Sequence, residues 1–228
     1  MEYGISAILN TLSTGTAAIL LLVTAVVSYL LGTCNGAILV SKFFLKDDVR
    51  AHGSGNGGLT NFQRTYGGTK LTVMVILVDM LKMVLAVVLT GLIFSAAMGP
   101  EPVPLFTRYW AGAFCVIGHV FPCTLNFKGG KGILAGGTLT FLVDWRVAVI
   151  AWGLFLLAVI LTRWVSLGSL LAATSVGVSS CVFFPVPSIM IFALLTAGLI
   201  DWKHRENIKR LLKGEESKLS LKRKKAQP

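Results

Sequence analysis

Charged residues are scarce in this sequence. Only 14% of its 228 residues are Asp, Glu, Lys or Arg, whereas 54% are hydrophobic, and the mean hydropathy is +0.76. Soluble domains carry about 25% charged residues, so this composition excludes an ordinary water-soluble protein. It predicts an all-α integral membrane protein.

Cysteine is also scarce. The four cysteines, Cys34, Cys115, Cys123 and Cys181, are isolated within apolar stretches. Their spacing matches neither a disulfide framework nor a metal site. We therefore expect four small, buried hydrophobic side chains and no bound metal.

Acidic residues are outnumbered by basic ones, 10 against 21, which gives a net charge of +11. Ten of the basic residues follow residue 202, so much of the excess lies near the C-terminus. A basic segment next to a bilayer is attracted to acidic lipids by roughly 1 kcal/mol per residue. The sequence thus predicts no nucleic-acid partner, one membrane domain over 1–217 and a basic, disordered cytoplasmic tail over 218–228.

Long apolar stretches predict the membrane-crossing helices. The expected positions are about 17–40, 71–98, 109–125, 132–143 and 147–162, with two more between 164 and 200 because Pro185-Val186-Pro187 divides that uncharged stretch. The stretch at 132–143 is shorter than the roughly 17–25 residues of a typical span. The number of spans, six or seven, depends on this short stretch.

The distribution of basic residues favours seven spans. With the N-terminus outside, seven crossings place eight basic residues from Lys42 to Arg163 and the ten C-terminal ones on the inner side. The outer side then receives only Arg108 and Arg146. This agrees with the positive-inside rule. Six crossings would instead place the basic C-terminal segment on the outer side, against that rule. We predict a seven-transmembrane-helix bundle with its N-terminus outside and its C-terminus cytoplasmic.

Two glycine-rich stretches, residues 53–61 and 127–132, stand out between the apolar segments. Glycine allows backbone N–H groups to converge on an anion. The first stretch and the residues just after it bring together several hydrogen-bonding side chains, namely Ser54, Asn56, Thr60, Asn61 and Arg64. They indicate either ligand binding or ordinary loop and helix-cap chemistry. A dinucleotide site is rejected because a charged segment, not a strand, precedes the glycines.

The second glycine-rich stretch reads Phe127-Lys128-Gly129-Gly130-Lys131-Gly132. If a helix begins at residue 132, its N-terminal amides and the charges of Lys128 and Lys131 form a phosphate site. The alternative is a positive-inside signal, which explains the lysines and not the glycines. A basic segment near the C-terminus, 204–214, predicts an interfacial helix that extends the last span, with His204 and Asn207 on one face.

Two further features have open interpretations. Asp79 and Lys82 are three residues apart, so they can pair on one face of a helix, either as a structural pair or as functional charges within the membrane. His119 lies within an apolar segment, where a hydrogen bond to a neighbouring helix explains it at least as well as chemistry does.

Together these segments resemble the bacterial acyl-phosphate:glycerol-3-phosphate acyltransferases of the PlsY type. The resemblance rests on residues 53–64 with Asp79 and Lys82, on 118–132, and on 204–216, and a stretch around 162–169 is also similar. It implies a multi-pass enzyme of the bacterial cytoplasmic (inner) membrane. Such an enzyme moves a fatty acyl group from acyl phosphate to the sn-1 hydroxyl of glycerol 3-phosphate and releases lysophosphatidate and phosphate. The resemblance implies no cofactor and no metal, and membrane lipids as surroundings.

The resemblance also assigns roles to residues. The catalytic residues would be Lys131, Ser54, Arg64 and His204. The substrate-binding residues would be Asn56, Thr60, Asn61, Lys128, Gly129, Gly130, Ser169 and Asn207. We hypothesise that the amides of Gly129 and Gly130 hold the donor phosphate, helped by Lys131, Ser54, Thr60 and Ser169. Arg64, Lys128, His204 and Asn207 would hold glycerol 3-phosphate.

Two departures from the family pattern bear on these assignments. The first glycine-rich stretch has Gly57-Gly58-Leu59 where the family has a bulky apolar residue and Gly-Ala, and Ala135 replaces a frequent threonine. We expect a more flexible loop and the loss of one hydroxyl. The competing functional class is a transporter or channel for a small phosphorylated anion, but no internal repeat is visible. A scaffold bound to acidic lipids would explain the tail only.

Overall fold

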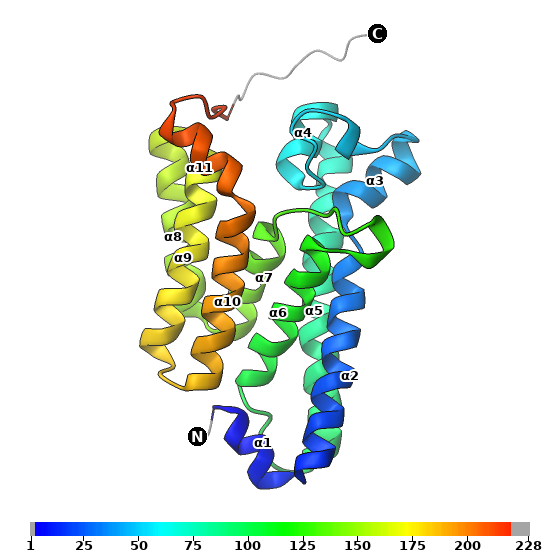
Figure 1. Ribbon diagram of the computed structural model, residues 1–228, viewed down its shortest axis with the longest axis vertical. Helices are drawn as coiled ribbons and strands as arrows, with labels where there is room; N and C mark the ends of the chain where they lie inside the picture. Colours follow the sequence, from blue (N-terminus) through cyan, green and yellow to red (C-terminus); the bar gives the residue numbers. More distant parts are fainter. Residues whose placement is uncertain (1–2, 220–228) are drawn as a thin grey trace.

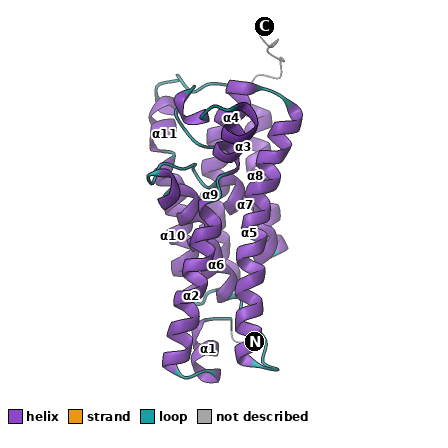
Figure 2. Ribbon diagram, turned by 90° about the vertical axis from the view of Figure 1, so that its right-hand side faces the viewer, coloured by secondary structure: helices purple, strands orange, loops and turns teal. Residues whose placement is uncertain are grey.

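The structure is a computed structural model that describes residues 3–219, apart from the side chain of Thr69. Within this range every regular element is a helix (Figure 2). The predicted tail at 218–228 lies outside the described residues from residue 220 onward.

The described chain forms helices of very different lengths. In chain order they are α1 Ile5–Thr11, α2 Thr14–Thr33, α3 Gly36–Leu45, η1 Val49–Ala51, α4 Leu59–Tyr66, α5 Thr69–Met98, α6 Phe106–Val120, η2 Cys123–Leu125, α7 Ile133–Val143, α8 Trp145–Thr162, α9 Val165–Phe183, α10 Pro187–Lys203 and α11 Arg205–Leu212.

The long helices run back and forth along one axis (Figure 1). Helix α2 packs against α5 and α6 on one side of the bundle, and α8, α9 and α10 pack together on the other, with α7 contacting both groups. The short helices α3, α4 and α11 gather at the end of the bundle where the described chain ends, and α1 lies at the opposite end. Both glycine-rich stretches therefore lie toward the end that carries α11 (Figure 1).

The surface of the bundle is apolar along its length. Residues such as Leu22, Ile160 and Leu161 are 66%, 74% and 73% exposed, which is typical of helices that face lipid. Four helices, α2, α5, α8 and α9, are long and apolar enough to cross a membrane. Helix α7 has 11 residues and is shorter than a typical span. The count of seven crossings and the orientation of the termini stay predictions.

The predicted helix at 17–40 is wrong as a single element. Helix α2 ends at Thr33 and α3 begins at Gly36, where the Asn35 side chain accepts a hydrogen bond from the amide of Ile38 (3.1 Å). The chain also leaves α6 at Val120 rather than at residue 125, since Pro122 cannot continue the helix.

Other helix boundaries follow the sequence closely. Pro187 begins α10, as expected from the two prolines that divide the last apolar stretch. A helix, α11, is present where the interfacial helix is predicted, but His204 (φ −93°, ψ 5°) separates it from α10, so it does not continue the last long helix.

The prediction of four buried cysteines is only partly right. All four are free thiols, and Cys115 is buried, but Cys34 and Cys123 are exposed and Cys181 is half-buried. Cys34 lies in the break between α2 and α3, and Cys123 begins η2. Both positions are helix ends, where the chain leaves the packed interior.

Two glycines bring α2 and α6 into close contact. A Cβ on Gly32 would overlap the carbonyl oxygen of Cys115, and a Cβ on Gly118 would overlap that of Tyr29. Both obstacles are backbone atoms, which cannot rotate away. The two helices therefore pack backbone to backbone, as small residues permit in membrane proteins.

We expect Gly118→Ala to destabilise the protein by about 1–3 kcal/mol, because the added methyl group forces the helices apart. Gly91 on α5 is the matched control, since, apart from its chain neighbours and the adjoining backbone of its own helix, no described atom lies within 4 Å of the position that an added methyl group would occupy there. Gly91→Ala should be neutral or stabilising by up to about 1 kcal/mol. Thermal unfolding of the purified protein in detergent measures both. Equal melting temperatures for the two variants would contradict the close-packing argument.

Candidate active site

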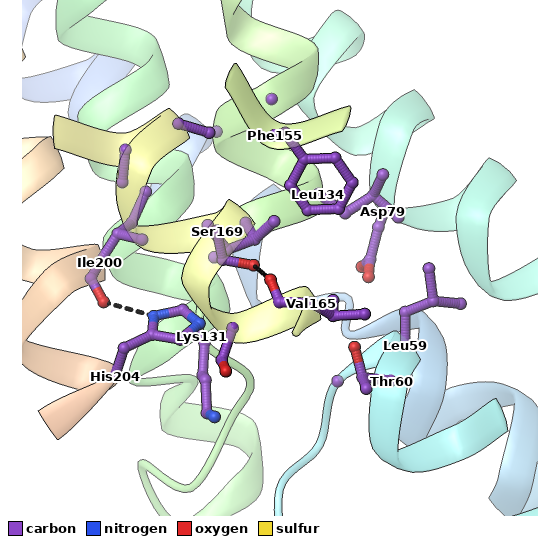
Figure 3. Close-up of a pocket in the computed structure, with 18 of the residues that line it drawn as sticks. Leu59, Thr60, Asp79, Lys131, Leu134, Phe155, Val165, Ser169, Ile200 and His204 are labelled. Atoms are coloured by element: carbon purple, nitrogen blue, oxygen red, sulfur yellow. Dashed lines mark hydrogen bonds between the residues drawn. The ribbon is translucent and has the colours of Figure 1, made fainter. Parts of the chain in front are cut away.

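A cavity of about 540 Å³ opens beneath the first glycine-rich stretch and runs between α5, α7, α8, α9 and α10. Nine of the twelve residues predicted for the site line it, and Figure 3 shows several of them pointing into it. They are Ser54, Asn56, Thr60, Asn61, Arg64, Lys131, Ser169, His204 and Asn207. Lys128, Gly129 and Gly130 are not among the lining residues.

Asn61 organises the first glycine-rich stretch. Its side-chain amide donates to the carbonyl oxygens of Val49 (2.9 Å), His52 (3.0 Å) and Asn56 (3.0 Å), and its oxygen accepts from the amide of Ser54 (2.9 Å). The residue is 3% exposed. A buried amide with all these partners holds the loop in one shape. Asn61 thus positions Ser54 and Asn56 at the cavity.

The backbone amides of Gly129 and Gly130, in the second glycine-rich stretch, already have hydrogen-bond partners. The amide of Gly129 donates to the carbonyl oxygen of Val120 (3.3 Å), and the amide of Gly130 donates to that of His119 (3.1 Å). Both groups therefore satisfy the last carbonyls of α6, which would otherwise lack partners. That these amides hold a phosphate stays a prediction, and in this arrangement both of them already donate to backbone carbonyls.

Lys128 also differs from its predicted role. Its side chain is exposed, and its carbonyl oxygen accepts a hydrogen bond from Arg50 Nη1 (3.1 Å). Lys131, three residues on, points into the cavity instead (Figure 3). Of the two lysines in this stretch, the structure places only Lys131 at the site.

Lys131 belongs to a network that joins the loop after α6 to α11. Its ammonium donates to Asn207 Oδ1, and Asn207 Nδ2 donates to Glu216 Oε1 (2.9 Å). Arg210 Nε donates to the other carboxylate oxygen of Glu216 (2.7 Å). The Glu216 side chain is only 3% exposed. The network fixes the positions of two cations around one buried carboxylate.

Burial and the nearby cations lower the pKa of Lys131. Burial lowers the pKa of its ammonium to about 8, and the positive charge of Arg210 acts in the same direction. Burial raises the pKa of the Glu216 carboxyl, but hydrogen bonds led by those from Asn207 and Arg210 outweigh this and leave the pKa below its ordinary value. Glu216 is therefore ionised at neutral pH, and Lys131 is close to its midpoint at mildly alkaline pH.

His204 is a neutral imidazole with one free nitrogen. It lies between α10 and α11 and is 4% exposed. Burial lowers its pKa to about 4, although the hydrogen bond to the carbonyl oxygen of Ile200 (2.8 Å) opposes the shift. A carbonyl oxygen only accepts, so Nδ1 carries the proton in this hydrogen bond, which Figure 3 draws as a dashed line. Nε2 is then a hydrogen-bond acceptor.

Two more predicted residues occupy opposite edges of the cavity. Ser169 is buried, and its hydroxyl donates to the carbonyl oxygen of Val165 (2.9 Å), which leaves its oxygen able to accept (Figure 3). Arg64 is exposed at the rim, and its Nη2 donates to the carbonyl oxygen of Ser217 (3.3 Å). This contact links α4 to the segment after α11.

The remaining walls of the cavity are mostly apolar. They come from residues deeper in the bundle, such as Leu134, Leu139, Phe155, Val176, Ala193 and Ala197. Along α10, from His204 to Ala193, the cavity extends about three helical turns, or roughly 16 Å. The cavity thus combines a cationic mouth with a deep apolar part.

Several lining residues, Asp79 and His119 among them, were not assigned to the site from the sequence. Two others are Arg210 and Glu216. Both were part of the third family-like segment, yet their meeting depends on a chain reversal after α11, where Gly214 has φ 72°. Ala135, expected to lose a phosphate-binding hydroxyl, is fully buried and does not line the cavity. Gly57, expected to add flexibility, is buried against Ile38.

The sequence is similar to known acyltransferases. Residues 22–214 match the family described as glycerol-3-phosphate acyltransferase. The glycerol-3-phosphate acyltransferase of Thermoanaerobacter pseudethanolicus is 38% identical over 199 residues, which cover 87% of this chain and 96% of that protein. The one from Finegoldia magna is 37% identical over 201 residues, with 87% and 96% covered.

The fold is also similar to solved structures. The crystal structure of PlsY (YgiH), an integral membrane glycerol 3-phosphate acyltransferase, in its glycerol 3-phosphate form has a TM-score of 0.74 at 32% identity, covering 88% of this chain and 96% of that one. Its lysophosphatidic acid form has a TM-score of 0.72 at 31% identity, with 88% and 95% covered. Because the sequence match extends from α2 to α11 and includes both glycine-rich stretches, this chain belongs to the glycerol-3-phosphate acyltransferase family.

Proposed function

We propose that the acyl donor of this enzyme is acyl phosphate and that the acceptor is the sn-1 hydroxyl of glycerol 3-phosphate. One observation carries the proposal: the cationic mouth and the deep apolar part belong to a single cavity. Both substrates bring a phosphate, and the donor also brings a long hydrocarbon chain. The solved relative was obtained in forms with glycerol 3-phosphate and lysophosphatidic acid, which are the acceptor and its acylated product.

The charges at the mouth suit two anionic substrates. Arg64, Lys131 and Arg210 line it, with Glu216 as the carboxylate among them. Arginine can hold a phosphate through two parallel hydrogen bonds, and Lys131 supplies a compact charge beside it. The mouth would face the cytoplasm of a bacterial inner membrane, where glycerol 3-phosphate is dissolved, while the acyl chain stays at lipid depth.

The reaction needs little covalent chemistry from the protein. The hydroxyl oxygen of glycerol 3-phosphate attacks the carbonyl carbon of acyl phosphate, a new ester C–O bond forms, and the C–O bond to phosphate breaks. The hydroxyl proton passes to an oxygen of a substrate phosphate. Orientation of the hydroxyl and stabilisation of the leaving phosphate are the main contributions that the cavity offers.

His204 fits the acceptor hydroxyl better than a phosphate. Its free Nε2 accepts hydrogen bonds, and an ionised phosphate oxygen also only accepts. A hydroxyl of glycerol 3-phosphate can donate to Nε2, so His204 orients the acceptor. Lys131 is the group suited to the leaving phosphate.

The donor assignment is tested with purified protein, palmitoyl phosphate and glycerol 3-phosphate. We expect phosphate release that depends on the acceptor and equals the lysophosphatidate formed, measured by mass spectrometry. Palmitoyl coenzyme A in place of palmitoyl phosphate should give no product. Turnover with the coenzyme A ester alone would overturn the donor proposal and leave the family membership untouched.

Lys131 should impose an alkaline limit on activity. Its ammonium is the form that attracts phosphate, so kcat/KM for glycerol 3-phosphate should fall as the pH rises through about 8. Lys131→Ala should reduce kcat/KM by on the order of 100-fold or more. Lys131→Arg keeps the charge at all relevant pH values and should abolish the alkaline decline.

The matched control for this series is Lys70→Ala, which removes an exposed lysine at the start of α5 that does not line the cavity. It should leave the pH profile unchanged. A Lys131→Ala enzyme that is folded and turns over at nearly the wild-type rate would refute the assignment.

The apolar part of the cavity should set the preferred chain length. Ala193 is 1% exposed and lines this part, so Ala193→Leu fills space that the chain would occupy. Displacing two methylenes of the acyl chain from this part of the cavity costs about 0.8 kcal/mol each, which corresponds to a roughly ten-fold loss in kcat/KM. We expect kcat/KM to fall about ten-fold for palmitoyl phosphate and less than about two-fold for octanoyl phosphate. Ala158→Leu makes the same enlargement at a buried residue that does not line the cavity. It should leave the ratio of kcat/KM for palmitoyl phosphate to kcat/KM for octanoyl phosphate unchanged.

A further inference from the structure

A buried polar cluster lies between the α2–α3 break and the second glycine-rich stretch. Asp79, Lys82 and His119 are 1%, 3% and 3% exposed. Lys82 Nζ lies 2.8 Å from Asp79 Oδ1 and 2.7 Å from His119 Nδ1. Buried charges at membrane depth are costly, so a cluster of this kind needs a structural or functional reason.

Asp79 and Lys82 form hydrogen bonds with the two helix ends at the break between α2 and α3. Lys82 Nζ donates to the carbonyl oxygens of Cys34 (2.9 Å) and Gly32 (3.3 Å), at the C-terminal end of α2. Asp79 Oδ1 accepts from the amide of Gly36 (3.1 Å), at the N-terminal end of α3. The cation meets the negative helix end and the anion meets the positive one. Asp79 and Lys82 therefore do more than neutralise each other, because they also supply hydrogen-bond partners to the ends of α2 and α3.

The contact with Lys82 also fixes the state of His119. An ammonium group only donates hydrogen bonds, so His119 Nδ1 must accept. In a neutral imidazole the proton is then on Nε2. Lys82 thus selects one tautomer and one orientation of the ring.

The other edge of the His119 ring lies against the second glycine-rich stretch. A Cβ on Gly130 would overlap His119 Nε2, and it would also come within 3.1 Å of the carbonyl oxygen of Gly57. The amide of Gly130 donates to the backbone oxygen of His119 (3.1 Å). The ring therefore packs where both glycine-rich stretches meet, directly beside the residue that precedes Lys131.

We propose that Lys82 and His119 are positioning residues for the acyl transfer. Lys82 holds the His119 ring in place, His119 sets the position of Gly130, and Gly130 sets the position of Lys131 in the cavity. The proposal rests on the role of Lys131 proposed above. His119 lines the cavity, whereas Lys82 and Gly130 do not, and the proposed effect on Lys131 requires none of the three to touch a substrate. Misplacement of a catalytic group by about 1 Å can cost on the order of 100-fold in rate.

The variant His119→Asn distinguishes the positioning of Gly130 by His119 from the simple hydrogen bond between His119 and Lys82. The Asn oxygen reaches about as far as Nδ1 and can still accept from Lys82, but nothing then fills the space against Gly130. We expect a folded protein in which Lys131 is displaced from Asn207. Its kcat should fall about 10- to 100-fold. The midpoint for reductive methylation of Lys131, followed against pH by mass spectrometry, should rise above that of the wild type.

Two more variants make the test decisive. His119→Gln reaches the position of Nε2, keeps contact with Gly130 and should retain the wild-type midpoint. Thr90→Val is the control, because the Thr90 hydroxyl is buried on the same helix as Lys82 and has no hydrogen-bond partner among the described residues. This variant should change neither kcat nor the methylation midpoint of Lys131.

The proposal is overturned if His119→Asn keeps the wild-type midpoint and rate, or if the Asn and Gln variants shift the midpoint equally. The methylation midpoint requires no turnover. An inactive wild-type protein would therefore count against the proposed acyl donor and not against the positioning role.

Discussion

The break between α2 and α3 is the constraint on which the mouth of the cavity depends. A helix that stops inside an apolar bundle exposes carbonyl oxygens at one end and N–H groups at the next, and apolar surroundings offer them no partners. Lys82 and Asp79 from α5 supply those partners, each at the helix end of opposite sign. The chain can then turn aside into α3 and carry the first glycine-rich stretch over the cavity. Without this capping, a straight α2 would extend past the site.

Glycine allows close packing at several places in this protein. Gly32 and Gly118 allow α2 and α6 to touch through their backbones, and Gly129 and Gly130 allow the following loop to lie directly on the end of α6. The N–H groups of the loop complete the hydrogen bonding of that helix end. Where water is scarce, a free amide held open for a ligand is costly, because it lacks a partner until the ligand arrives.

The basic side chains at the mouth of the cavity outnumber the acidic ones. Glu216 offsets part of the charge of Lys131 and Arg210 and holds both in place, Lys131 through Asn207 and Arg210 directly. Burial, together with the excess of positive charge, lowers the pKa of Lys131 to about 8. An arriving phosphate reverses that effect by favouring the ammonium. Substrate binding and protonation of Lys131 are therefore coupled in a site that is ready to accept anions.

The sequence by itself determined the class of protein, most helix positions and the family. Apolar length and proline placement act locally, so α5, α8, α9 and α10 are close to their predicted positions, and the family signatures are properties of short segments. Tertiary structure alone decided that α2 stops at Thr33, that Lys128 points outward, and that Glu216 returns to Asn207. It also decided that the amides of Gly129 and Gly130 are occupied. These outcomes depend on which backbone groups lack partners once the helices pack, and the contacts that satisfy them often join residues far apart in the chain, as Lys82 and Cys34 are.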